Sequence, residues 1–214
     1  MKTIADGACQ IRQKTILGLL ILTLSGCSLP LPDQPVRPQL YDLGPALSLA
    51  DGAQPSAAAL ALGPVIAPAA IDGTQIIYRL AYSDGGQQPR PYAQARWAMT
   101  PPQLVGQRLR QALSTRRPVV DAGAGLAPLE LRAELDEFAQ IFTAADASAG
   151  VVRLRVTAIA PTASGNRLLG QRTFAVSKPA ATNDAPGAAA ALRAATDEVV
   201  RQVVAWVNEL GARS

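Results

Sequence analysis

The stretch "LELRAELDEFAQIF", residues 129–142, decides which fold this sequence predicts. Leucine and alanine occupy every second position from Leu129 to Leu135, and glutamate or arginine occupies each position between them. This period of two residues is typical of a β-strand with one face buried and the other in solvent. The alternation changes phase at Asp136 and Glu137, which predicts a β-bulge or the end of the strand there.

Two later segments are also predicted to be strands and are expected to pair with each other. Residues 151–160, "VVRLRVTAIA", alternate between apolar side chains and arginine or threonine. The turn signal "SGN" at 164–166 separates them from "RLLGQRTFAVS" at 167–177, which predicts an antiparallel hairpin. Shorter strands are expected at residues 40–44, 74–83 and 119–123 and within 58–71, with a turn or exposed loop at 84–91.

A first helix is expected after residue 100. Thr100 can cap it, with Pro101 or Pro102 in its first turn. Its apolar side chains recur at helical spacing, and this pattern leaves Arg108 away from the apolar face.

A second helix is expected from about residue 186 to residue 210, with Asp184 as its N-cap. A continuous apolar stripe along it includes Trp206, while Asp197 falls on the exposed side. Both tryptophans, Trp97 and Trp206, are expected in the core. The predicted fold class is therefore α+β: an antiparallel β-sheet with two main helices packed on one face.

The composition excludes several classes of function. The chain has 214 residues and no histidine, which excludes Ser-His-Asp and Cys-His catalysis and histidine-containing zinc sites. Its formal net charge is +4 and its aromatic content is 4%, without a block of basic residues, so no nucleic-acid partner is expected. We also expect no metal, no cofactor other than a covalent lipid, and no enzymatic activity.

The N-terminus has the layout of an export signal. Basic residues precede the uncharged stretch "TILGLLILTLSGC" at residues 15–27, as in a secretory signal peptide. Its end, "LSGC", resembles the lipobox of bacterial lipoproteins. This resemblance implies cleavage between Gly26 and Cys27 and attachment of S-diacylglycerol and an N-acyl chain to Cys27. Cleavage also removes Cys9, so the mature chain is expected to form no intrachain disulfide.

A proline-rich segment follows the lipidation site. Residues 28–39, "SLPLPDQPVRPQ", contain four prolines and are expected to form an extended tether. Ser28 stands where an aspartate would resemble an inner-membrane retention signal, so we expect the anchor in the outer membrane, facing the periplasm. The predicted organisation is a removed signal peptide at 1–26, a lipidated cysteine and tether at 27–39, and one folded domain at 40–214.

Several motifs occur behind the lipobox in a recognisable order: "LALGPV", "QIIYRL", "RWAMTPPQLVGQRLRQAL", "FAVSKPA" and "VVRQVVAWV". Together they resemble the ABC-type transport auxiliary lipoprotein family, over about residues 40–210. The resemblance implies a sheet-plus-helices domain without catalytic activity. It also implies a partner in an ABC transport system that carries MCE-domain subunits and moves lipids between envelope membranes, and it allows a homo-oligomer.

Arginines on the two long strands are the candidate contact residues. Arg153 and Arg155 share one face of their strand, and Arg172 lies on the strand expected beside it. Arginine forks match phosphate oxygens, so these side chains could contact lipid phosphates or an acidic partner. The alternative is structural, because pairing across strands with Glu130 or Glu134 would neutralise them.

Two functional hypotheses remain open at this point. The first is a non-catalytic, lipid-anchored accessory component that docks an MCE-type ABC transport system at the outer membrane. The second is a periplasmic, chaperone-like lipoprotein with its own apolar cavity for a lipid. A hydrolase built on carboxylates such as Glu134 and Asp136 is disfavoured, since no second carboxylate cluster faces them. A solid core with an exposed apolar or charged edge would favour docking.

Overall fold

The computed structural model describes residues 37–45, 57–123 and 125–211, and the statements below concern these residues. The predicted signal peptide, the predicted lipidation site Cys27 and most of the predicted tether lie outside them. The elements are β1 (Gln39–Tyr41), β2 (Leu60–Ile66), β3 (Gln75–Leu80), β4 (Arg90–Trp97), α2 (Pro101–Ser114), β5 (Val119–Asp121), β6 (Leu129–Ala144), β7 (Ala147–Thr162), β8 (Gly165–Pro179) and α3 (Ala185–Gly211).

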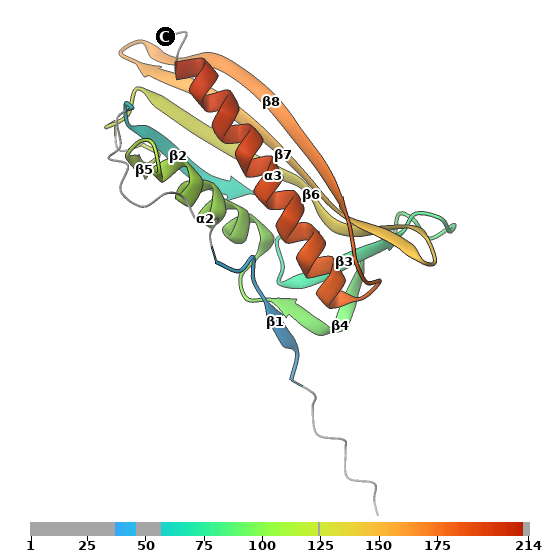
Figure 1. The fold of residues 1–214 in the computed structure, drawn as a ribbon. Helices are drawn as coiled ribbons and strands as arrows, with labels where there is room; N and C mark the ends of the chain where they lie inside the picture. Colours follow the sequence, from blue (N-terminus) through green and yellow to red (C-terminus); the bar gives the residue numbers. More distant parts are fainter. Residues whose placement is uncertain (1–36, 46–56, 124, 212–214) are drawn as a thin grey trace, which may run out of the picture. The chain divides into compact units, whose positions relative to one another are not determined.

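Strand β6 is the central strand of the sheet (Figure 1). β7 runs antiparallel to it along nearly its whole length. On the other edge of β6, β2 pairs with its first residues and β3 pairs with its last residues. The register between β6 and β7 shifts between Leu135 and Glu137, which confirms the predicted bulge. β8 extends the sheet beyond β7, β5 extends it beyond β2, and β4 and β1 extend it beyond β3.

The sheet is mixed, which corrects the expectation of a purely antiparallel sheet. β6 runs parallel to β2 and β3, β2 runs parallel to β5, and β1 runs parallel to β4. Side-chain alternation reports which face of a strand is buried, whereas strand direction depends on the connections between strands. The expected loop at residues 84–91 is also too long, because β4 begins at Arg90.

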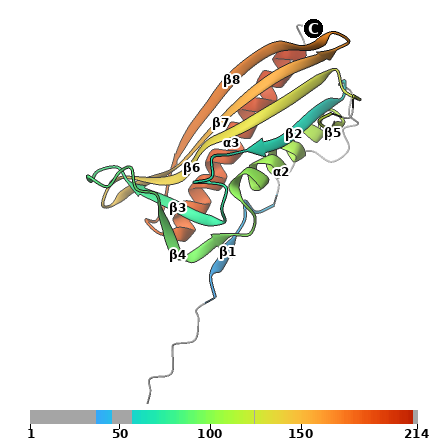
Figure 2. The same cartoon turned by 180° about the vertical axis from the view of Figure 1, so that it is seen from behind.

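Both helices cover the same face of the sheet, as predicted (Figures 1 and 2). α3 lies along β7 and β8, and α2 lies beside α3 and over β2. One continuous cluster of buried apolar side chains fills the space between the sheet and the helices. Trp97 and Trp206 are 1% and 8% exposed, which confirms their expected place in this core.

The helix starts follow the signals in the sequence. The backbone N–H of Thr100 donates to Oε1 of Gln103 at 3.1 Å, as in a capping box. At the start of α3, Oδ1 of Asp184 accepts the N–H of Gly187 at 2.9 Å, which confirms the predicted N-cap. This cap satisfies a backbone donor that has no partner within the helix.

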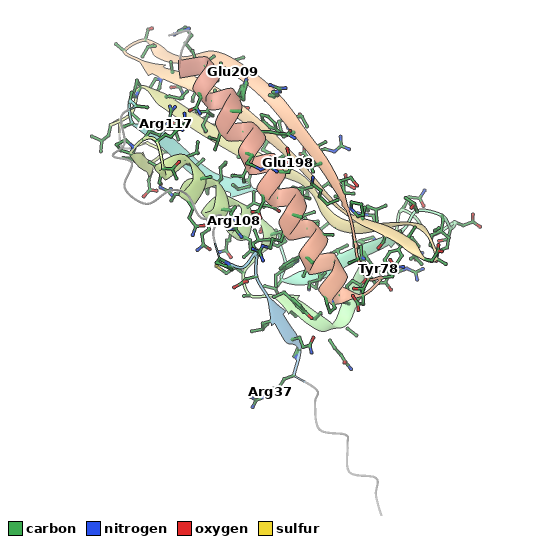
Figure 3. The ribbon with its side chains drawn as sticks, in the orientation of Figure 1. Arg37, Tyr78, Arg108, Arg117, Glu198 and Glu209 are labelled. Atoms are coloured by element: carbon green, nitrogen blue, oxygen red, sulfur yellow. The ribbon has the colours of Figure 1, made fainter. Side chains whose placement is uncertain are left out.

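Arg108 is buried, which corrects the expectation that it lies away from the packed face of α2. Its side chain is 4% exposed, and Figure 3 shows it beside α2 and α3. The guanidinium donates to the backbone oxygens of Leu43 and Pro45, the latter at 2.8 Å. The charged group thus finds backbone acceptors in the segment after β1, while its aliphatic stem lies among apolar side chains.

Asp197 on α3 is half-buried, although the sequence pattern places it on the exposed side. Its Oδ1 atom lies 3.3 Å from Nε of Arg108, and its side chain is 14% exposed. Burial raises the pKa of Asp197, and the charges of Arg108, Arg193 and Arg201 oppose this effect. Arg108 and Asp197 therefore connect α2, α3 and the segment after β1 around one polar centre.

Replacement of this arginine is expected to be costly. Arg108→Met should lower the free energy of unfolding by about 3 kcal/mol or more, because buried oxygens lose a charged donor. Urea unfolding measures the change. Arg110→Met, on the same helix, is the matched control, since its partner Asp121 is 88% exposed and such a pair contributes below about 1 kcal/mol. Equal losses in the two variants would contradict this account.

Gly150 allows α3 to lie directly on β7. A Cβ atom at this position would lie 2.6 Å from the backbone of Ala191 and of Leu192. Backbone atoms inside a helix cannot move aside as the end of a flexible side chain can, so the contact requires glycine.

A methyl group at this contact should therefore displace the helix. Gly150→Ala is expected to lower the free energy of unfolding by about 1–3 kcal/mol, measured by urea unfolding. Gly63→Ala in β2 is the matched control, because its Cβ would meet no atom closer than 3.6 Å. The control should be neutral or slightly stabilising. A neutral Gly150→Ala variant would show that the helix contact is not tight.

Candidate interaction surface on strands β7 and β8

Strand β8 forms one edge of the sheet. It is 15 residues long and, in the described part of the chain, pairs with β7 alone. An edge strand presents a row of backbone N–H and C=O groups to which another chain can bind. β8 contains Arg167, Arg172 and Lys178 and no acidic residue, so this edge is basic.

The side chains of β8 alternate between the helices and solvent. Phe174 is 3% exposed and packs edge-on against Trp206, with ring centroids 5.9 Å apart. Arg172 lies on the same face, and its guanidinium carbon is 5.4 Å from the centroid of the Phe174 ring. Arg172 is exposed and lies within ion-pair distance of no carboxylate among residues 37–45, 57–123 and 125–211.

Arg153 and Arg155 lie on the opposite face of the sheet, which points away from the helices. Arg155 contacts Asp136 at 2.8 Å and Glu134 at 3.2 Å, and the hydrogen bond to Asp136 is the largest cause of its raised pKa. Arg153 lies 3.7 Å from Glu137. The structural interpretation of these arginines, pairing across strands with Glu134, is thus confirmed for Arg155. Glu130 pairs instead with Arg132 on its own strand.

The structure does not bring the three candidate arginines together. Arg172 lies opposite Val156 in the β7–β8 register, and Val156 faces the helices. Arg155 lies opposite Thr173, on the other face. Arg153 and Arg155 are neutralised by carboxylates, whereas Arg172 belongs to the basic edge. This edge was not predicted from the sequence, although a strand with three basic residues and no acidic residue has the charge pattern of a protected edge.

Metal ligands and membrane-spanning helices are two further features that bear on function. In the described ranges, no group of three or more acidic or cysteine side chains is placed to hold a metal ion. Among the same residues, neither helix is long and apolar enough to cross a membrane.

The fold and this surface define a class of protein: a two-layer α+β domain in which the described residues leave one basic sheet edge without a second strand partner. A family model described as "ABC-type transport auxiliary lipoprotein component" matches residues 41–204. The match covers more than half of the chain, and the protein belongs to this family. It is accordingly a lipid-anchored auxiliary component of the cell envelope, in a family associated with ABC-type transport.

Solved structures with the same fold are distant in sequence. Protein XCC0632 of Xanthomonas campestris, of family model DUF330, is 19% identical with a TM-score of 0.70, covering 82% of this chain and 97% of its own. The hypothetical protein CT253 of Chlamydia trachomatis is 12% identical with a TM-score of 0.54, covering 74% and 100%. These likenesses show the fold alone. No curated protein matches the chain.

The ion pairs of Arg155 are expected to contribute little to stability. Arg155→Gln should lower the free energy of unfolding only slightly, because its side chain is 39% exposed and the pairs are screened by solvent. The small loss should shrink further in 1 M salt, measured by urea unfolding at both ionic strengths. A loss as large as that expected for Arg108→Met and independent of salt would contradict this assignment.

Proposed function

We propose that this chain is a non-catalytic, lipid-anchored accessory subunit that docks an MCE-type ABC transport system at the outer membrane for lipid transport. The family supports a role beside an ABC transporter. The observation that carries the docking role is the free basic edge of β8, which pairs with no second strand in the described residues.

Docking proceeds by addition of a strand to β8. An extended segment of the MCE-domain subunit binds to the outer edge of β8 through backbone hydrogen bonds. Acidic side chains on that segment pair with Arg167, Arg172 and Lys178, which form the basic edge. Charge disfavours the pairing of β8 with β8 of a second copy, because all charged side chains of β8 are basic and any two that come to lie opposite each other repel.

The packing of the core favours docking over lipid carriage. The space between the sheet and the helices, where a lipid chaperone would hold an acyl chain, is filled by the continuous cluster of side chains. Val200 and Val207 of α3 are also buried in this core, so their apolar side chains are already covered. The alternative function, a chaperone-like lipoprotein with its own apolar cavity, receives less support from these observations.

Site-specific crosslinking tests the docking edge. A photoreactive amino acid at Gln171 or Thr173, both exposed on β8, should trap the MCE-domain subunit in intact cells. The same amino acid at Gln107, exposed on α2, is the matched control and should not trap it. Arg172→Glu should reduce the crosslink from Thr173 several-fold. Equal crosslinking of the MCE-domain subunit from β8 and from α2 would contradict docking through β8. A crosslink from β8 to a second copy of this chain would also contradict it.

The lipid anchor is tested at Cys27. Several acyl chains, at about 0.8 kcal/mol per buried CH₂, hold a protein on a membrane almost permanently. Cys27→Ala should therefore block lipidation and cleavage, and the variant should keep the mass of the unprocessed chain in mass spectrometry. Cys9→Ala is the control and should be processed normally. A Cys27→Ala protein of normal mature size in the membrane fraction would disprove the anchor.

A further inference from the structure

A second surface feature lies at the end of the sheet where α3 ends. It is an open hollow of about 400 Å³, a volume within the range of small-molecule sites. Leu129, Leu169 and Leu210 contribute to an apolar floor. Two arginines, Arg117 and Arg167, also line the hollow, and none of the described residues that line it is acidic.

Arg117 is a buried cation that lies within ion-pair distance of no carboxylate in the described part of the chain. It is 7% exposed, and Figure 3 shows it near the end of α3 that carries Glu209. Its guanidinium donates to Oδ1 of Asn208 at 2.8 Å, which is a neutral acceptor. Burial and the neighbouring charge of Arg116 lower the pKa of Arg117. A charge taken out of water in this way is stabilised by an anion that reaches it.

Arg167 supplies a second positive charge from another element. It stands near the start of β8, whereas Arg117 stands between α2 and β5, so the two reach the hollow from segments far apart in sequence. The side chain of Arg167 is exposed, and no described carboxylate lies within ion-pair distance of it. Two guanidinium groups at one apolar hollow suit a phosphate or carboxylate, which both accept forked hydrogen bonds.

We propose that this hollow binds an anionic amphiphile, with its head group on Arg117 and Arg167 and the start of its chain on Leu129 and Leu169. The mainly apolar lining favours an amphiphile over a free anion, because a hydrated anion gains nothing from an apolar floor. It also disfavours an acidic peptide, whose backbone groups would lose water without new partners. This site is distinct from the filled core, and it shares Arg167 with the basic edge of β8.

Photolabelling tests the site in the full-length lipidated protein, reconstituted in phosphatidylcholine nanodiscs. The probe is dodecyl phosphate that carries a diazirine on its chain. Labelled peptides should contain Leu129 or Leu169. Arg167→Gln should weaken labelling roughly tenfold, as expected for the loss of a charged hydrogen bond. Arg172→Gln, on the same strand but outside the hollow, is the matched control and should label normally.

Competition with unlabelled compounds identifies the ligand class. Unlabelled dodecyl phosphate or dodecanoate should displace the probe. The compound that displaces it at the lower concentration identifies the preferred head group. The assignment would be overturned if the uncharged dodecyl maltoside, inorganic phosphate alone or an acidic peptide displaced the probe as well as the anionic amphiphiles do. Normal labelling of Arg167→Gln would also overturn it. Because Arg167 is exposed, this variant tests the site even where an Arg117 variant fails to fold.

Discussion

The domain depends on the hydrogen bonding of β6 along both of its edges. One edge pairs with β7 over nearly the whole strand, and the other pairs with β2 and then with β3. This arrangement joins segments from distant parts of the chain to one strand of 16 residues. Because a slip of one residue would turn the apolar side chains of β6 towards solvent, its register is strongly specified.

The position of β6 determines where the other strands and the two helices pack. β7 and β8 extend one side of the sheet, and α3 covers them closely because Gly150 has no side chain. Arg108 then ties α2 and α3 to the segment after β1, so the helices are held on one face. With that face filled, the basic outer edge of β8 and the hollow at the end of α3 are the two surfaces proposed for binding. The proposed docking uses an edge that has no second strand partner in the described residues.

Much of this fold could be predicted from local patterns. The alternation in β6 and β7, the hairpin of β7 and β8, the phase change at Asp136 and the cap at Asp184 depend on neighbouring residues, and each is confirmed. Strand direction and the edge position of β8 could not be predicted, because side-chain alternation indicates which face of a strand is buried and not which strands lie beside it. Arg108 shows a second limit of prediction from sequence. A charged residue in a helix is expected to be exposed, yet Arg108 is buried because backbone oxygens distant in sequence accept its hydrogen bonds.

The most direct test of docking is hydrogen exchange in β8 of the full-length lipoprotein, alone and with the MCE-domain subunit. A strand added to β8 would protect the amides that point away from β7, since these have no strand partner in the described residues. The account predicts slower exchange at these amides in the complex, and no change in β6, which is already paired on both edges. A formed complex in which β8 exchanges as fast as in the free protein would contradict it.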